Sequence, residues 1–339
     1  HGEDPTAHAG PIEYEGYFVL ADEIARVRDA VAEKLASVAF PTSPKVLVLG
    51  AGAMGCLLGG LMAGGNPNAS GEPLDVTFLD TWEAHITAMK NKGLKFKLKD
   101  GGERVFKVNA TSDPKKLGQF DVVIVQTKAG ATRDAVASVK HCFHDKTVAV
   151  SFQNGLGNED IIAEVLGTKG KPAIDKVFGG QTLQGASIAG PGVVNIHTDL
   201  GSYMGEWACG TSERASALAH IFTTAGLKTW EDANMANKKW MKVIYNCVVS
   251  PLSALSNLYH KDVYCRKGAK EVANSIIKEA LAAAHAEGVA ITEAEGHECL
   301  EKVIASNQSN KSSMAMDIES KPSRTSEMDF INGRIALIA

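Results

Sequence analysis

The sequence of 339 residues lacks the marks of several classes of protein. It contains no apolar run near the ~20 residues that a membrane-spanning helix needs. Lys and Arg form no dense cluster, and the net charge is −4, which argues against nucleic acid or a membrane as partner. The six cysteines form no CxxC pair and no His/Cys group at zinc spacing, and there is no signal-peptide core. We therefore expect a cytoplasmic protein with free thiols and no bound metal.

What is present indicates two domains after a short extension. The length exceeds one typical core of ~100 to 200 residues, and the composition, 45% hydrophobic and 22% charged, is that of a globular protein. Apolar residues at three- and four-residue steps predict an amphipathic helix over residues 20–38, within an extension of residues 1–43. Short β-branched runs predict an α/β domain over residues 44–232, with a parallel sheet covered on both faces. Residues 233–339 are mostly helix-forming and predict a helical domain.

The segment "VLVLGAGAMG" is the most specific short motif in the chain. An apolar strand runs directly into glycines with GxGxxG spacing, and a helix-forming segment follows. The first glycine permits a tight turn, the second lets the backbone approach a pyrophosphate, and the third lets the helix pack on the strand. The motif therefore predicts a Rossmann dinucleotide-binding domain, with a cofactor site formed by Gly50, Ala51, Gly52, Ala53, Met54 and Gly55.

An acidic residue, Asp80, ends the next strand-like segment, "LDVTFLD". A carboxylate at this position can accept both ribose hydroxyls of the adenosine, and it repels a 2′-phosphate. NAD(H) is therefore favoured as cofactor. NADP(H) stays possible, because Lys90 and Lys92 are near enough in the sequence to serve a phosphate if the intervening loop folds differently.

Polar residues also follow two later strands. Lys128 follows "FDVVIVQT", and Asn154 follows "TVAVSFQ". Ligands in such folds lie beyond the carboxyl ends of the strands, so we expect both side chains to line one crevice with the glycine motif.

In "KKWMKVIYNCVVSP", polar residues recur at every fourth position of an apolar, aromatic-rich run. Lys242, Asn246 and Ser250 would share one face of a helix. Pro251 is expected to end or kink that helix and to leave carbonyl groups a turn earlier unpaired. A single Lys is usually a surface side chain, but the surrounding apolar residues favour burial, which lowers the pKa of an amine toward the range useful for proton transfer.

The motifs together resemble the family of 2-dehydropantoate 2-reductases, also called ketopantoate reductases. "GAGAMG", "VQTKA", "FQNG", "WMKVIYNCVVSPLSAL" and "SSMAMDIESKPSRTSEMDFING" follow one another in the family's order. The resemblance covers about residues 45–339. It implies a Rossmann domain and a helical domain similar to the C-terminal domain of 6-phosphogluconate dehydrogenase, with the active site between them in a homodimeric enzyme.

The resemblance also implies roles for single residues. Lys242 corresponds to the family's general acid, and Glu327 to a carboxylate that pairs with this lysine and helps to bind substrate. Asn246 and Ser313 correspond to substrate-binding residues, with Ser250 beside them. Lys128 and Asn154 resemble contacts to cofactor and substrate, the asparagine serving both. An ammonium beside the 2-oxo group would stabilise the growing negative charge on oxygen and donate the proton.

The sequence departs from the family pattern at several points. Ser250 stands where the family usually has Asn, and Asp80 is followed by Thr81 and Trp82 rather than by the basic residue of NADP-dependent members. The spacing from Ser313 to Glu327 is two residues longer than usual. The family's final helical segment is expected to follow residue 339.

Three functions follow as hypotheses. The first is a NAD(P)H-dependent reductase that converts a 2-oxo acid to a 2-hydroxy acid, most simply a 2-dehydropantoate 2-reductase. The second is a NAD-dependent D-2-hydroxyacid dehydrogenase that acts on another branched or aromatic 2-oxo acid, favoured by Asp80 and Ser250. The third is a protein that binds the dinucleotide without turnover, in which replacement of Lys242 would change nothing.

Overall fold

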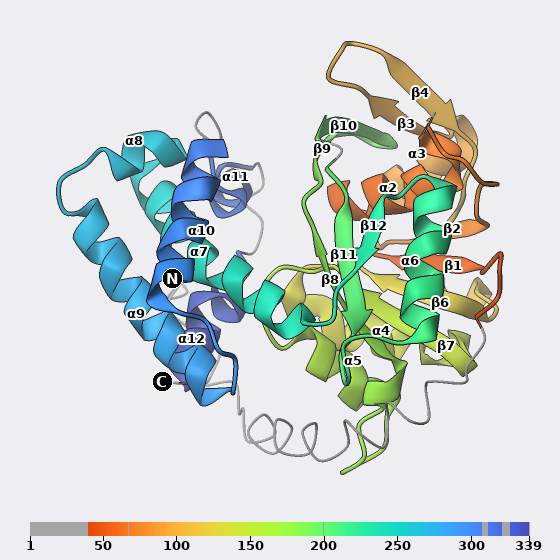
Figure 1. The fold of residues 1–339 in the computed structure, drawn as a ribbon. Coiled ribbons are helices and arrows are strands. Elements are labelled where there is room, and N and C mark those ends of the chain that lie inside the picture. Colours follow the sequence, from red (N-terminus) through yellow and green to blue (C-terminus); the bar gives the residue numbers. More distant parts are fainter. Residues whose placement is uncertain (1–39, 67, 199, 307–310, 321–325, 339) are drawn as a thin grey trace, which may run out of the picture.

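The computed structural model describes residues 40–338, except 67, 199, 307–310 and 321–325. Its strands all lie between Val46 and Glu231, and a series of helices begins at Met235 (Figure 1). The α/β fold with a parallel N-terminal sheet and a helical C-terminal part is therefore confirmed. The helix expected at residues 20–38 lies outside the described residues. None of the helices that are described is long and apolar enough to cross a membrane.

The main sheet has eight strands in the order β12-β11-β8-β7-β6-β1-β2-β5. Neighbouring strands are parallel except β8 and β11, which run antiparallel. The carboxyl ends of β1, β2, β6, β7 and β8 therefore meet at one edge, where such folds place their ligands. The strands are β1 (Val46–Leu49), β2 (Val76–Leu79), β5 (Asn109–Thr111), β6 (Phe120–Val125), β7 (Phe143–Ser151), β8 (Val177–Thr182), β11 (Ser202–Glu206) and β12 (Thr229–Glu231).

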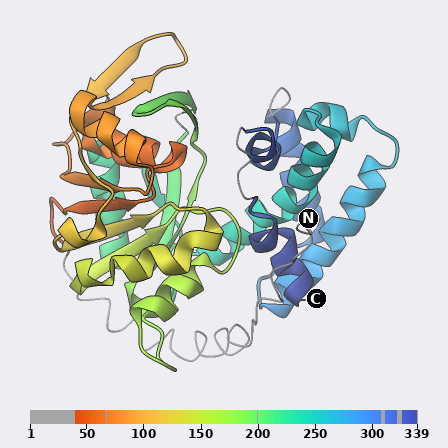
Figure 2. The ribbon, with the colours of Figure 1, turned by 180° about the vertical axis from the view of Figure 1, so that it is seen from behind.

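Both faces of this sheet are covered, which explains the apolar runs of its strands. Along β1, Val46 and Val48 point into one core, and Leu47 and Leu49 point into the other. The first core contains residues of α2 (Ala53–Gly60), α3 (Glu83–Lys92) and α6 (Glu213–Ala225). The second contains residues of α4 (Thr132–Ser138) and α5 (Asn158–Leu166), which cover the sheet in the view from behind (Figure 2).

A second sheet is inserted in the α/β part. Its order is β4-β3-β10-β9, with β3 (Leu94–Lys97), β4 (Glu103–Phe106), β9 (Gly185–Gly190) and β10 (Val193–Thr198). Phe96 and Val194 of this sheet join the core around α2. The sequence predicts further strands here but not a separate sheet, because the parallel pairing of β3 with β10 joins segments nearly a hundred residues apart.

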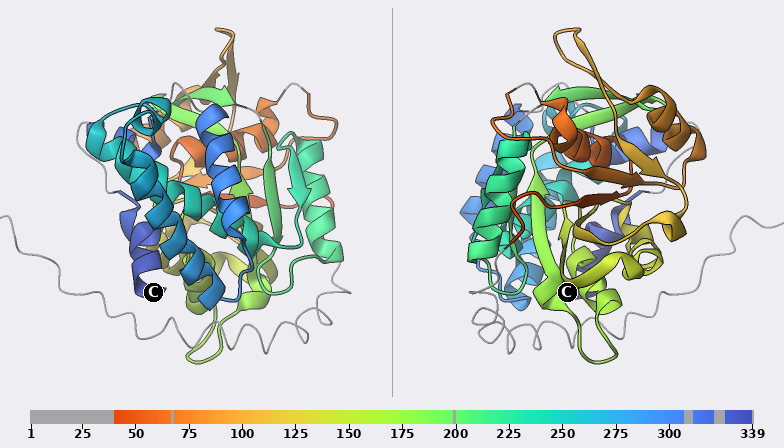
Figure 3. Two further views of the ribbon diagram at one scale, coloured as in Figure 1. Left: turned by 60° about the vertical axis from the view of Figure 1, so that its left-hand side comes forward. Right: turned by 90° about the vertical axis from the view of Figure 1, so that its right-hand side faces the viewer.

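The helical part is built around the 22-residue helix α7 (Met235–Ser256), against which α9, α10 and α11 pack. Figure 3, left, brings α9 and α10 to the front. The other helices are α8 (His260–Tyr264), α9 (Ala269–Ala286), α10 (Glu293–Ser306), α11 (Ser313–Glu319) and α12 (Asn332–Ile338). Short helical turns complete the described chain: η1 (Leu61–Gly65), η2 (Pro114–Lys116), η3 (Ala129–Ala131), η4 (Lys140–Cys142), η5 (Ile174–Lys176) and η6 (Met328–Phe330).

Helix α7 does not end at Pro251, so the ending, one of the two outcomes expected there, is wrong; the kink stays a prediction. The helix continues to Ser256 and stops before Asn257, which has a φ of 58°. Pro251 has no N–H to give the carbonyl of Cys247, and the side-chain amide of Asn332 donates to this carbonyl instead, at 2.9 Å. The carbonyl expected to face a ligand is thus bound by α12, which is thereby fixed against α7.

We expect Asn332→Ala to lower the free energy of unfolding by about 1 to 2 kcal/mol, because the carbonyl of Cys247 loses its partner. Urea denaturation measures the change. Asn274→Ala, on the exposed side of α9, is the matched control and should leave stability within about 0.5 kcal/mol of the parent. Equal effects of the two substitutions would contradict the role given to Asn332.

Candidate functional site

The glycine loop between β1 and α2 has the geometry of a phosphate-binding turn. Gly50 has a φ of 101°, and a Cβ there would lie 2.8 Å from the carbonyl oxygen of Gln126. A Cβ at Gly55 would lie 1.9 Å from the carbonyl oxygen of Gly50. Gly52, by contrast, is exposed, has open space within 4 Å of the place where a Cβ would lie, and precedes α2 without a side-chain cap. The first N–H groups of α2 are thus free to bind an anion, and the loop fits a dinucleotide.

Asp80 lies at the end of β2, directly beside this loop. One carboxylate oxygen accepts a hydrogen bond from the N–H of Ala51 at 2.7 Å, and the other accepts from the N–H of Trp82 at 2.9 Å. The side chain stays partly exposed. A negative charge is therefore held at the glycine loop, where it opposes a second negative group such as a 2′-phosphate.

Lys128, three residues after β6, reaches across to the helical part of the protein. Its amine lies 2.6 Å from a carboxylate oxygen of Asp317 in α11 and 3.7 Å from one of Glu327. The side chains of Asp317 and Glu327 are 8% and 11% exposed, so two nearly buried carboxylates face one amine. The resemblance implies that Glu327 pairs with Lys242, but in this structure the ion pair of Glu327 is with Lys128, and its charge acts on Lys242 from farther away.

Asn154 follows β7 in a loop that touches the C-terminal segment. Its carbonyl accepts from the side-chain amide of Asn158 at 3.0 Å. Two residues later, the N–H of Leu156 donates to the carbonyl of Phe330 at 2.9 Å. Gly155 has a φ of 85° and a Cβ there would lie 2.6 Å from the same Phe330 carbonyl oxygen, so glycine permits the close approach.

Lys242 points from α7 to the carboxyl end of the main sheet. Its amine donates to the carbonyl of Thr182, the last residue of β8, at 3.3 Å. Burial, together with the charge of Lys239, lowers the pKa of this amine to about 8, against the raising effect of Glu327. Most of the Lys242 amine is therefore protonated at neutral pH. Its proton is still given up more easily than that of an ordinary lysine, as a general acid requires.

The other predicted substrate contacts differ in exposure. Asn246, one turn after Lys242, is partly exposed, whereas Ser250 is only 3% exposed and its carbonyl accepts from the hydroxyl of Ser312 at 3.1 Å. Ser312 is also the N-cap of α11, where its hydroxyl accepts from the N–H of Ala315. Ser313 itself is exposed at the start of α11 and is open to a ligand.

Three charged residues at this junction are absent from the sequence-based set. Asp317 pairs with Lys128, and its position four residues after Ser313, on the same helix face, was a usable signal. Lys239 and Glu159 form a buried ion pair, 2.5 Å long. No pattern marks Glu159, which follows a glycine-rich turn like any solvated acid. Among the described residues, no group of three or more His, Cys, Asp or Glu is placed to hold a metal ion.

Comparison with known proteins gives the family. The model for "Ketopantoate reductase PanE/ApbA" matches residues 46–208, and that for "Ketopantoate reductase PanE/ApbA C terminal" matches residues 234–339. The chain belongs to the ketopantoate reductase family. It is therefore an oxidoreductase of the CH–OH group that uses a nicotinamide dinucleotide.

Relatives and solved structures agree over most of the chain. The 2-dehydropantoate 2-reductase of Halobacterium salinarum is 32% identical over 280 residues, 81% of this chain and 86% of that protein. That of Pyrococcus horikoshii is 32% identical over 292 residues, 86% and 89% of the two chains. A ketopantoate reductase from Ralstonia eutropha has a TM-score of 0.75 at 26% identity, covering 87% and 91%. D-mandelate dehydrogenase with NADH and anilino(oxo)acetate shares the fold, with a TM-score of 0.76 at 23% identity over 87% and 91%.

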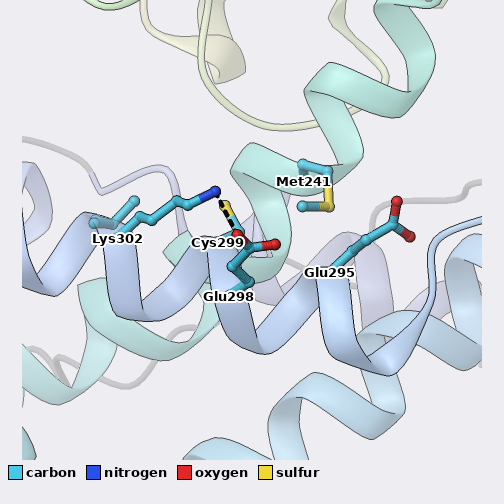
Figure 4. A pocket seen from close by; sticks show the side chains of 6 residues that line it. Met241, Glu295, Glu298, Cys299 and Lys302 are labelled. Atoms are coloured by element: carbon cyan, nitrogen blue, oxygen red, sulfur yellow. Dashed lines mark ion pairs between the residues drawn. The ribbon is translucent and has the colours of Figure 1, made fainter.

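A separate cavity of about 450 Å³ lies on the helical domain, away from these residues. Met241 of α7 and residues of α10 line it, among them Cys299 and an ion pair of Lys302 with Glu298 at 2.6 Å (Figure 4). None of the site residues predicted from the sequence contributes to its wall.

We expect Lys242→Met to raise the free energy of unfolding by about 1 to 2 kcal/mol at pH 7, because the native state no longer holds a charged amine in a half-buried place. The native pKa lies below that of the unfolded chain, so the penalty is full below about pH 8 and fades as the pH rises toward 10.5. Urea denaturation at several pH values measures this effect. The stability that the variant gains over the parent should decrease from about pH 8 toward pH 10.5. Lys270→Met, on the exposed side of α9, should show neither effect.

Proposed function

We propose that the protein reduces a 2-oxo acid to a 2-hydroxy acid, with 2-dehydropantoate as substrate and Lys242 as general acid. The proposal rests above all on the place of the Lys242 amine, with its lowered pKa, at the carboxyl end of β8. Strands β1 and β8 are both parallel to the strands between them, so the glycine loop lies at the same edge of the sheet. The names of the relatives support the same substrate.

The proposed division of work follows the two parts of the chain. Residues 44–232 bind the dinucleotide through the loop of Gly50, Ala51, Gly52, Ala53, Met54 and Gly55, and residues 233–339 supply the proton and most substrate contacts. The bound nicotinamide supplies a hydride to C2 of the oxo acid. Lys242 donates its proton to the oxygen on C2 and becomes a neutral amine.

The substrate carboxylate and hydroxyl groups need polar partners around C2. We assign these contacts to Asn154, Asn246 and Ser313. The support is their position: Asn154 in the loop after β7, Asn246 one turn after Lys242 in α7, and Ser313 at the start of α11. Glu327 is assigned to hold Lys128 and, through its charge, to keep the pKa of Lys242 from falling further. Asp317 also holds the amine of Lys128. We assign Lys128, in this paired position, to contact the cofactor or the substrate.

NAD(H) is proposed as the preferred cofactor. The support is the fixed carboxylate of Asp80 at the glycine loop, which favours ribose hydroxyls and opposes a 2′-phosphate. We also propose that the enzyme is a cytoplasmic homodimer. Sedimentation at micromolar concentration tests the assembly.

We expect kcat/KM for reduction to fall tenfold per pH unit above about pH 8, where Lys242 loses its proton in the free enzyme. Lys242→Met should lower kcat by about 10² to 10⁴ and leave the dissociation constant of NADH within about threefold. Initial rates from pH 6 to 10 measure the first effect, and fluorescence titration measures the second. A variant with parent-like turnover would exclude Lys242 as the acid.

The identity of the substrate and cofactor is tested by a matrix of rates. We expect ketopantoate to give the highest kcat/KM, and NADH to be preferred to NADPH by at least about tenfold, because of the charge of Asp80. The parent is assayed with ketopantoate, phenylglyoxylate and 2-oxoisovalerate, each with both cofactors. Asp80→Asn should lower the ratio of kcat/KM with NADH to kcat/KM with NADPH. A preference for NADPH in the parent would overturn the cofactor assignment.

A second candidate is a D-2-hydroxyacid dehydrogenase for another branched or aromatic acid. It is favoured by Ser250, which stands where the family usually has Asn and is buried, so one substrate-facing amide is replaced by a hydroxyl. In the matrix of rates, this candidate predicts a higher kcat/KM for phenylglyoxylate or 2-oxoisovalerate than for ketopantoate.

A further inference from the structure

A buried ion pair joins the helical part to α5 of the α/β part, near Lys242 and Asn154 of the proposed site. The amine of Lys239, in α7, lies 2.5 Å from a carboxylate oxygen of Glu159, in the first turn of α5. Their side chains are 4% and 0% exposed. The same amine donates to the carbonyl of Gln153 at 3.0 Å and lies 3.5 Å from that of Ser151 at the end of β7. One lysine therefore binds the end of β7, the loop after it and the helix that follows.

The carbonyls and the acid that Lys239 binds belong to a network that reaches two predicted site residues. The side-chain amide of Gln153 donates to the carbonyl of Thr127 at 2.9 Å and to the hydroxyl of Thr132 at 2.8 Å. Thr127 directly precedes Lys128, and Gln153 directly precedes Asn154. The network thus connects the loops after β6 and β7 to α7.

On α7 itself, Lys239 lies one turn before Lys242, so the two side chains are neighbours on the surface of the helix. Each donates to a backbone carbonyl of a neighbouring part of the sheet: Lys239 to Gln153 after β7, and Lys242 to Thr182 at the end of β8. Two points of attachment to the sheet restrain the rotation of the helix about its axis more than one point would.

We propose that Lys239, held by Glu159, is a positioning residue for the reaction: it fixes the turn of α7 that carries Lys242 against the loop that carries Asn154. This inference rests on the proposed function, since it concerns the geometry of the same proton donor. In this role Lys239, whose side chain is buried, acts through the two residues that it orients.

The energetics favour a functional role over a stabilising one. Two charges removed from water lose hydration, and replacement of such a pair by apolar side chains of similar volume is often neutral or stabilising. A buried pair is therefore poor evidence for a contribution to stability. What the pair provides is a single arrangement of α7, α5 and the loop after β7, because any rotation would leave a charge without its partner.

The charge of Lys239 also acts on the proton donor. The charged groups that act on Lys242 are Lys239 on its own helix and Glu327 from the segment before η6. Glu327 lies near Lys128, which also meets Asp317 of α11, while Lys239 is neutralised by Glu159 of α5. Changes to the two members of the buried pair should therefore move the pKa of Lys242 in opposite directions.

The test compares Lys239→Met with Glu159→Gln. Lys239→Met removes a positive charge near Lys242 and leaves the carboxylate of Glu159, so the basic limb of the kcat/KM profile should move up by about half to one pH unit. Glu159→Gln leaves Lys239 without its counter-charge, so the limb should move down by a similar amount. Both variants should lose kcat by about 10- to 100-fold, with KM for NADH within about threefold. The inference would be overturned if the basic limb moved in the same direction in both variants. It would also be overturned if the limb did not move and both variants kept the kcat of the parent.

A double variant keeps the test decisive if a single variant does not fold. Lys239→Met with Glu159→Leu replaces the whole pair by apolar side chains, so it should fold with a Tm close to the parent. We still expect kcat to fall at least about tenfold, because the attachment to Gln153 is lost; parent kcat in the folded double variant would overturn the inference. The matched control is Arg214→Met with Glu206→Leu, which removes another buried pair, 2.6 Å long, beside the start of β8 and away from Lys242. It should leave kcat and the pH profile unchanged.

A readout without turnover separates this inference from the proposed function. The pH dependence of acetylation of Lys242 by acetic anhydride, followed by peptide mass spectrometry, reports the pKa of this amine directly. If the parent reduces none of the oxo acids, the proposed function fails, while opposite shifts in the labelling curves of the two single variants still support the positioning role. Equal labelling curves in parent and variants refute it even when the parent is an active reductase.

Discussion

The attachment of α7 to the carboxyl edge of the main sheet is the constraint on which the site depends. Two amines one turn apart bind backbone carbonyls that the sheet presents there, Gln153 after β7 and Thr182 at the end of β8. A carbonyl at a strand end has no further strand partner, and an ammonium group satisfies it with a strong, charge-assisted hydrogen bond. Helix α7 is thereby held with Lys242 at the edge of the sheet where the glycine loop also lies.

The same edge makes a third contact from the next strand. Lys128, after β6, meets Asp317 and Glu327 from the helical part. Three neighbouring strands, β8, β7 and β6, thus each meet the C-terminal part through a lysine, and the lysines come from both sides of the junction. Carboxylates of Asp317, Glu327 and Glu159 balance the charges of Lys128 and Lys239, so Lys242 is the amine proposed to meet the anionic 2-oxo acid.

The cost of this arrangement is a set of charges in poorly hydrated places, the amine of Lys242 among them. Burial that disfavours the charged amine in the native state also makes its proton easier to transfer. Stability and chemistry therefore make opposite demands at one residue, which is common at active sites. Pairing of a buried polar group is seen at Cys247, where the side-chain amide of Asn332 donates to the carbonyl that Pro251 leaves without a donor.

The features that could be predicted from the sequence are local: β1, the glycine turn and α2, the acid at the end of β2, and the helical C-terminal half. Each follows from a short-range pattern, such as β-branched runs, glycine spacing or helical periodicity. The order of motifs also identified the family, through residues such as Lys242 that no composition argument would single out. Asp317 was within reach, because its spacing from Ser313 places both on one face of a helix.

Which groups meet became known only from the folded chain. The continuation of α7 through Pro251 depends on an amide 85 residues beyond Cys247, and the second sheet depends on pairing of distant segments. Glu159 looks like a solvated acid until α7 places Lys239 against it, and Glu327 meets Lys128 because the segment before η6 reaches the loop after β6. Burial and pairing of charges are properties of surfaces brought together from distant parts of the chain, so no local pattern encodes them.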